Sequence, residues 1–142
     1  MTRRILVPVD GSACSDRAVG HLIRTFTLKG EAAVDVLHVA PEISVRGIDP
    51  DSVPGPVGRL EREEEERRTK SARDLIDKAG VPYECRYEMG DPAETIVRHC
   101  RVHACDEIIM GARGLGALGS LVLGSVANKV LHLVDVPVTL VK

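Results

Sequence analysis

Five short apolar runs alternate with longer segments of helical periodicity, and this alternation restricts the possible folds of the chain most strongly. The apolar runs, which we predict to be β-strands, are residues 5–9, 33–39, 83–89, 107–111 and 136–141. Several are almost continuously apolar, as expected for a parallel sheet with helices on both faces. Right-handed crossovers turn this order into a doubly wound, mostly parallel sheet in three α/β/α layers. The sequence therefore predicts an α/β fold.

Helical periodicity and terminal residues define the intervening helices. We predict helices over residues 15–28 and 59–79, and two more that start near residues 91 and 124. The tetrapeptide DPAE at residues 91–94 is a helix-start signature, with a capping aspartate, an early proline and a glutamate three residues after the cap. The faces expected to point inward include Leu75 and Ile76 in the second helix and Val130 and Leu131 in the fourth.

Length and composition favour one soluble domain that spans residues 1–142. The net charge of −2 argues against nucleic acid as a partner, because binding a phosphate backbone usually requires a basic surface. The first apolar run is too short for a signal peptide or a membrane span, so we expect a cytoplasmic protein without membrane contact. None of the four cysteines forms a C-x-x-C pair, and we interpret them as reduced, mostly buried thiols.

Two loops should border the binding site. Ligands of doubly wound sheets bind at the carboxyl ends of the strands, where the strand order reverses. If the first strand is central, the reversal lies between the first and fourth strands. The loop after the first strand holds Asp10, and the loop after the fourth holds the stretch GARGLGALGSLVLGS at residues 111–125.

The glycine stretch can be read in two frames. Gly114, Gly116 and Gly119 give G-x-G-x-x-G, the pattern of a dinucleotide-binding loop. That fingerprint needs a following helix and a second strand that ends in an acidic residue, whereas Asp135 precedes the last predicted strand. A phosphate-binding loop of the G-x-x-x-x-G-K-[ST] type does not occur. The context therefore favours the longer frame G-x2-G-x9-G-S.

The longer frame predicts a phosphate site built mostly from backbone. Gly111 and Gly114 lack side chains that would keep a ligand from the main chain. Gly124 and Ser125 open a helix, whose first amides are unpaired and whose dipole favours an anion. Ser125 could also ligate a magnesium ion, and Arg113 could supply a positive charge. The alternative is that the glycines only make the loop flexible.

The sequence resembles the universal stress protein family over nearly its whole length. The matching stretches are ILVPVDGS at residues 5–12, VLHVAP at 36–41, GDPAETIV at 90–97 and the last third of the chain from residue 108. The frame G-x2-G-x9-G-[ST] is typical of the family's ATP-binding branch, and Gly111, Gly114, Gly124 and Ser125 match it without a gap. The resemblance also implies the fold of adenine nucleotide alpha hydrolase-like proteins.

The resemblance implies a role for each site residue. Pro8, Val9 and Asp10 would lie at the adenosine end, with Asp10 bonding the ribose or a metal. Val39 would offer its backbone to adenine, and Met110 would pack nearby. Gly111 and Gly114 would border the ribose and phosphates, and Gly124, Ser125 and Val126 would hold the outer phosphates. Mg²⁺ would bind at Asp10 and Ser125.

The chain departs from many ATP-binding relatives at Gly119 and Ser120, because those relatives carry a basic residue at these positions. Arg113 is then the nearby cation, and ADP or AMP could bind comparably.

The resemblance further implies a regulatory stress-response protein that binds ATP and hydrolyses it slowly at most. Such proteins usually form homodimers through the final strand, which here is Pro137 with residues 138–141, and an unknown protein partner would respond to the bound state. Two alternatives stay open. The same site could serve an adenylyl or phosphoryl transferase, or the chain could be a flavin-binding or purely structural dimer module.

Three other features have less specific interpretations. The stretch HCRVHAC at residues 99–105 suggests a metal site, but Cys100 lies about 100° from the histidine face of a helix. We interpret it as a solvated histidine pair, His99 and His103, beside buried thiols. The segment at residues 41–58 is expected to be an exposed loop and is a candidate lid. Cys14 falls in the first turn of a helix, where a thiolate is favoured.

Overall fold

The computed structural model describes residues 2–29, 32–41, 56–114 and 123–142, and it contains all nine predicted elements. The strands are β1 (Arg3–Pro8), β2 (Ala32–Ala40), β3 (Tyr83–Met89), β4 (Glu107–Gly111) and β5 (Val138–Val141). The helices are α1 (Ala13–Lys29), α2 (Pro56–Ala79), α3 (Pro92–Val102) and α4 (Ser125–Leu133).

The strands form one parallel sheet in the order β3-β2-β1-β4-β5. β1 is therefore central, and the strand order reverses between β1 and β4, as the sequence predicted. β3 and β5 are the two edges. The predicted doubly wound α/β fold is confirmed.

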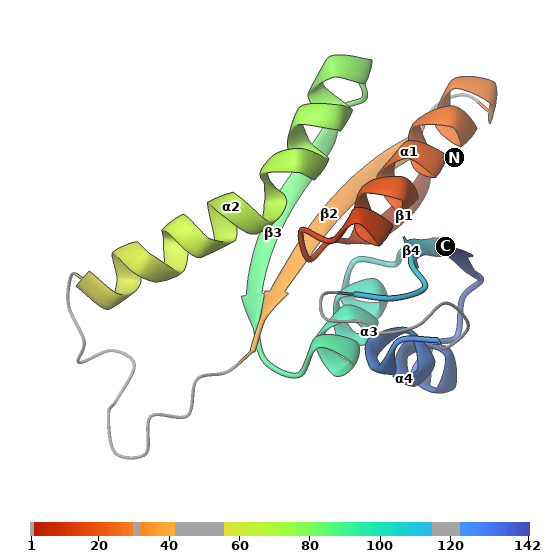
Figure 1. Cartoon of the computed structure of the whole chain (residues 1–142). Helices are drawn as coiled ribbons and strands as arrows, with labels where there is room; N and C mark the ends of the chain where they lie inside the picture. Colours follow the sequence, from red (N-terminus) through yellow and green to blue (C-terminus); the bar gives the residue numbers. More distant parts are fainter. Residues whose placement is uncertain (1, 30–31, 42–55, 115–122) are drawn as a thin grey trace.

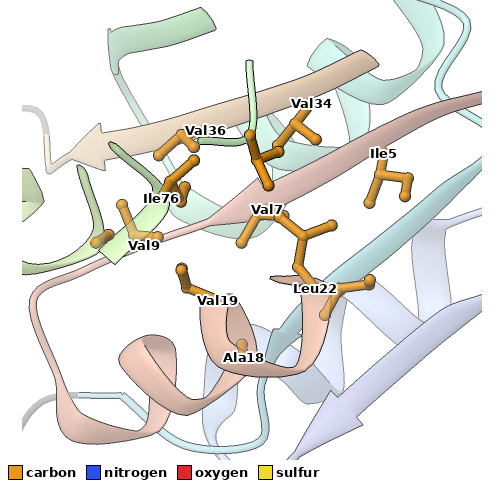
Figure 2. Close-up of a cluster of buried hydrophobic side chains, with 12 residues drawn as sticks. Ile5, Val7, Val9, Ala18, Val19, Leu22, Val34, Val36 and Ile76 are labelled. Carbon is orange, nitrogen blue, oxygen red and sulfur yellow. The ribbon is translucent and has the colours of Figure 1, made fainter. Parts of the chain in front are cut away.

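Two helices cover each face of the sheet. α1 and α2 lie on one side, whereas α3 and α4 lie together on the other (Figure 1). The core on the first side contains Val7 and Val36 from the sheet, Leu22 from α1 and Ile76 from α2 (Figure 2). The core on the second side holds the residues that alternate with these along the strands, such as Leu6 and Leu37, against α3 and α4. This alternation explains why the central strands are apolar on both faces.

Several predicted boundaries and faces were wrong. β5 begins at Val138 instead of residue 136, and α2 begins at Pro56, so the last residues of the predicted 41–58 loop are helical. Residues 42–55, which hold the rest of the candidate lid, lie outside the described residues. The inward orientation of Leu75 and Leu131 was also wrong, because these side chains are 40% and 42% exposed.

The exposed leucines have identifiable causes. In α2 the buried stripe includes Thr69, a polar residue whose hydroxyl donates to the Glu65 carbonyl at 2.9 Å. The stripe therefore runs through Thr69, Ala72 and Ile76, and Leu75 falls beside it. The short helix α4 packs mainly on α3. Only a narrow face of α4 is therefore covered by α3. Val130 lies on that face, whereas Leu131 lies outside it.

Candidate functional site

A cavity of about 590 Å³ opens where the strand order reverses. It lies at the carboxyl ends of β1, β2 and β4 and reaches the first turns of α3 and α4. All eleven residues that the sequence analysis assigned to a nucleotide site contribute to its wall: Pro8, Val9, Asp10, Val39, Met110, Gly111, Arg113, Gly114, Gly124, Ser125 and Val126. The structure therefore brings the predicted set together, and their role in binding stays a prediction.

The end of β1 is held in place by the neighbouring strand β2. The amide of Val9 donates to the Leu37 carbonyl at 2.9 Å, and Nδ1 of the buried His38 donates to the Val9 carbonyl at 2.9 Å. The chain then turns at Gly11, whose φ of 84° is left-handed. Asp10 is oriented inside this turn, because its Oδ1 accepts the Ser12 amide at 2.9 Å. The carboxylate of Asp10 is thus fixed by local backbone at the rim of the cavity.

The glycines of the long frame are required by close packing within the protein. A Cβ at Gly111 would lie 3.0 Å from the Cys14 carbonyl carbon in the first turn of α1. A Cβ at Gly114 would lie 2.5 Å from Oδ2 of Asp10, and one at Gly124 would lie 3.2 Å from the Ala112 carbonyl oxygen. The sequence analysis attributed these glycines to the approach of a ligand. The structure instead shows that they let the two loops approach each other, so the loops share one rim.

The amino terminus of α4 faces the cavity without a side-chain cap. Its N-cap is Gly124, whose extended backbone donates to the Ala112 carbonyl at 2.8 Å. The other two helices at this edge are capped by side chains, since Ser12 Oγ accepts the Ser15 amide and Asp91 accepts the Glu94 amide. The first amides of a helix have no acceptor within the helix. At α4 they can therefore bind an anion in the cavity.

The cations near the cavity differ in position. Arg113 lines the cavity and is half-buried. Lys129 of α4 lies outside the cavity wall and makes ion pairs with Asp91 at 3.1 Å and Glu94 at 3.4 Å. Among the described residues of the wall, Arg113 is thus the only lysine or arginine. Gly119 and Ser120, the positions at which the sequence departs from the resemblance, lie outside the described residues, as does Gly116.

Comparison with known proteins places this architecture. The model of the Universal stress protein family matches residues 1–142. This chain belongs to the universal stress protein family. The "Universal stress protein in QAH/OAS sulfhydrylase 3'region" of Thermus aquaticus is 36% identical over 148 residues and is covered, like this chain, over 100% of its length.

Two solved structures share the fold. The structure of MJ0577, a universal stress protein of Methanocaldococcus jannaschii, has a TM-score of 0.80 and 28% identity, over 100% of this chain and 96% of that one. The universal stress protein from Archaeoglobus fulgidus in complex with dAMP has a TM-score of 0.71 and 23% identity, over 100% of this chain and 98% of that one. Both likenesses extend over the whole sheet and its helices.

In this universal stress protein, sequence reasoning missed part of the cavity wall. The missed residues come from helix starts and strand ends whose side chains are small or apolar: Ser15, Leu37, Pro41, Pro92, Ile96 and Ala127. Leu37 precedes Val39 by two positions on β2 and so shares its face, which is a signal in the sequence. Pro92 and Ile96 belong to α3, and they are brought to the cavity by the packing of that helix.

The thiols behave as predicted, whereas the histidines do not. All four cysteines are free, and three of them, Cys14, Cys100 and Cys105, are buried. Burial raises the pKa of the Cys100 thiol and raises that of Cys105 to about 12. The predicted solvated histidine pair is wrong, because His99 is only 2% exposed.

No described helix is long and apolar enough to cross a membrane.

Proposed function

We propose that this protein binds an adenine nucleotide in the cavity between β1, β4 and α4, with ATP as the preferred ligand and ADP or AMP as further ligands. The observation that supports this most directly is the uncapped amino terminus of α4, which faces the same cavity as the Asp10 carboxylate. One cavity thus offers donors for phosphate oxygens and an acceptor for hydroxyl groups. Phosphate oxygens and ribose hydroxyls occur together in a nucleotide.

The lining favours one orientation of the nucleotide. Val9, Val39 and Met110 form an apolar wall with Leu37, which suits a planar base. Asp10 would accept hydrogen bonds from the ribose hydroxyls. The phosphates would then reach Gly111, Gly114 and the first turn of α4, where Ser125 adds a hydroxyl and Arg113 a positive charge.

A magnesium ion fits the same residues. Asp10 and Ser125 both line the cavity and carry oxygen ligands, the type that Mg²⁺ prefers. When bound, the ion would neutralise charge on the phosphates. These two side chains would hold it together with phosphate oxygens, and Arg113 would compensate for the charge that remains.

We infer a regulatory function with slow hydrolysis at most. Rapid phosphoryl transfer requires a group that orients the attacking nucleophile and further cations at the γ-phosphate. Among the described wall residues, only Asp10 and Arg113 carry charge. The protein would thus act in a cytoplasmic stress response by presenting a nucleotide-bound state to a protein partner. The likeness to the dAMP complex, at 23% identity, contributes to the fold assignment, so the proposal depends on the cavity itself.

Ligand-induced stabilisation tests the nucleotide proposal. The purified chain should melt at a higher temperature with ATP, and to a lesser degree with ADP or AMP, and Mg²⁺ should increase the ATP effect. GTP and FMN serve as competitors. Stabilisation by FMN alone would support the flavin alternative, and stabilisation by none of the five would overturn the proposal. Rapid ATP turnover would indicate a transferase or hydrolase.

Arg113→Gln and Lys129→Gln form a matched pair for this test. Each removes one positive charge from the same edge of the molecule, but only Arg113 lines the cavity. Arg113→Gln should reduce the ATP-induced shift more than the AMP-induced shift, because its charge acts on the outer phosphates. Lys129→Gln should leave both shifts unchanged. Equal effects of the two variants would show only a general loss of positive potential.

We also propose that the protein forms a homodimer through β5. This strand is an edge of the sheet, and its unpaired backbone groups favour pairing with a second copy. The carbonyls of Pro137 and Val141 accept the amides of Ile108 and Ala112, at 3.0 and 2.8 Å. Backbone groups of a strand alternate in direction, so Val138 and Leu140 direct theirs outward.

Proline substitution distinguishes the two sides of β5. Val138→Pro removes an outward amide and should give a monomer with unchanged secondary structure. Thr139→Pro removes an inward amide and should destabilise the sheet. Light scattering after size-exclusion chromatography measures the mass, and circular dichroism measures the fold. A Val138→Pro protein that stays dimeric would exclude β5 as the interface.

A further inference from the structure

A second polar cluster lies on the α3 side of the sheet and outside the cavity wall. It consists of Asp35 from β2 and of His99 and His103 from α3. Nε2 of His99 lies 3.2 Å from Oδ2 of Asp35, and the two imidazole rings are tilted by 32° with centroids 4.1 Å apart. One ligand atom from each residue can be chosen so that all three lie within 4.8 Å of one another. Asp35 and His99 are buried, and His103 is half-buried.

We propose that Asp35, His99 and His103 bind a divalent transition-metal ion of the zinc class. Two histidines four residues apart on a helix project from the same face and can both reach one ion. Imidazole nitrogen together with one carboxylate oxygen is a common ligand set for zinc, cobalt and nickel. The half-buried position of His103 leaves an approach from solvent for the ion and for a water ligand.

Unsatisfied atoms beside the cluster support this assignment. Among the described residues, three buried side-chain atoms have no hydrogen-bond partner, namely His99 Nδ1, Glu88 Oε2 and Arg86 Nε. His99 Nδ1 lies 4.0 Å from Glu88 Oε1. With the imidazole proton on Nε2, His99 donates to Asp35, and Nδ1 faces the Glu88 carboxylate as a second acceptor. Two acceptors cannot bond each other.

A metal ion on Nε2 would remove this conflict. The proton would then reside on Nδ1 and could be donated to Glu88. Metal-bound histidines usually donate their second nitrogen to a carboxylate in this way, which fixes the ring and increases its basicity as a ligand. A purely structural role, in which a charged imidazole of His99 donates to both Asp35 and Glu88 and anchors α3 to the sheet, would also account for Nδ1 but would not involve His103.

The charges around the cluster set the expected strength of binding. Nη1 of Arg4 lies 3.2 Å from both oxygens of Asp35 and so competes with a cation for this carboxylate. Arg4 is 34% exposed, so it can retain Oδ1 while the ion takes Oδ2. Nearby, Arg86 pairs with Glu84 on β3. Asp35 and Glu84 are thus already paired with guanidinium groups, so an ion would have to share Asp35 with Arg4.

The neighbouring thiols do not belong to this site. Cys100 directs its sulfur to the Cys105 carbonyl at 3.8 Å, on the core side of α3. The proposed ligands are therefore nitrogen and oxygen only, and this can be read from the spectrum of a bound ion.

Calorimetry with Zn²⁺ and Co²⁺ tests the proposal on the full chain, without nucleotide and after treatment with a chelator. We expect one ion per chain, and a Co²⁺ complex whose spectrum shows visible d–d bands but no thiolate charge-transfer band. His103→Gln should weaken binding at least tenfold while the fold is preserved. His132→Gln is the matched control, because His132 is an exposed histidine of α4 whose Nδ1 donates a hydrogen bond to the Asn128 carbonyl.

Two further variants separate the alternatives. Asp10→Asn removes the carboxylate of the nucleotide cavity and should leave Zn²⁺ affinity unchanged. Arg4→Gln removes the competing cation and should increase Zn²⁺ affinity severalfold. The proposal is overturned if the chain binds no ion, if His103→Gln binds as tightly as the parent chain, if His132→Gln or Asp10→Asn is equally damaging, or if the Co²⁺ spectrum shows a thiolate band.

Discussion

A Cβ at Gly114 would lie 2.5 Å from Oδ2 of Asp10, a separation at which one of the two must move. The two residues belong to loops that follow different strands, β1 and β4, and the contact sets the distance between those loops. Asp10 is also held by the Ser12 amide at 2.9 Å, so its carboxylate has little freedom to withdraw. The glycine thus fixes the position of an acidic group at the proposed ribose site.

The first prediction follows from this contact. Gly114→Ala should lower the affinity for ATP at least about tenfold, which corresponds to about 1.4 kcal/mol, because it displaces Asp10. Binding can be measured by calorimetry. Gly20→Ala is the control, since a Cβ there meets only Arg24 Nη1 at 3.5 Å. That variant should keep full affinity and gain about 0.5–1 kcal/mol of stability, because alanine favours the helix. Unchanged affinity in Gly114→Ala would contradict the proposed nucleotide site.

Most of the fold and the location of the cavity could be predicted from local patterns. Alternating strands and helices leave few topologies, and the carboxyl ends of β1 and β4 must then meet at the reversal of strand order. The reason for the glycines could not be predicted in the same way. Gly111 and Gly124 are required by close approach to α1 and to the loop at Ala112, and such approaches between distant segments leave no local pattern.

The second prediction contrasts two neighbours on α2. Ile76 is fully buried in the core between α1, α2 and the sheet (Figure 2). Its neighbour Leu75 is 40% exposed. Ile76→Ala should reduce the free energy of unfolding by about 2–5 kcal/mol, and Leu75→Ala by less than about 1 kcal/mol. Urea denaturation measures both values. Similar losses would mean that the buried stripe of α2 runs through Leu75, as the apolar pattern alone suggested.

The buried histidine shows why some site residues escape sequence reasoning. The i, i+4 spacing of His99 and His103 identified a shared helix face. The apolar side of α3 was predicted to face the sheet, but the burial of His99 was not. Its partner is Asp35, a charged residue within an apolar strand, which lies 3.2 Å from His99 and pairs with Arg4. The two residues are 64 positions apart in the sequence, and only the packing of α3 on β2 brings them together.

The third prediction concerns the cap of α3. The Glu94 amide that donates to Asp91, and then the ion pair with Lys129, lower the pKa of the Asp91 carboxyl. The stability from this group is therefore present above the unfolded pKa of about 3.9 and is lost as the pH falls through the lower folded pKa. Asp91→Ala should lower the melting temperature at neutral pH by a few degrees, since the helix loses its cap. Thermal melts from neutral to acidic pH measure this.

Asp91→Asn is the control for the cap. Asparagine still accepts the Glu94 amide but carries no charge, so this variant should lose less stability than Asp91→Ala at neutral pH. Its difference from the parent chain should disappear in acid, where Asp91 is protonated. If Asp91→Asn were as unstable as Asp91→Ala at neutral pH, the ion pair with Lys129 would account for the effect instead of the cap.

The fourth prediction uses the two tyrosines of a chain that has no tryptophan. Burial, followed by a hydrogen bond to Asp77, raises the pKa of Tyr83 to about 12, and burial also raises the pKa of Tyr87. The near-ultraviolet absorbance of tyrosinate should therefore rise well above pH 10, and Tyr83→Phe should remove the later part of that rise. Because the folded pKa of Tyr83 is raised, its contribution to stability is complete below about pH 10 and is lost as the pH approaches 12. Ionisation of both tyrosines near pH 10 in the folded chain would show that β3 is more exposed at this edge than the structure indicates.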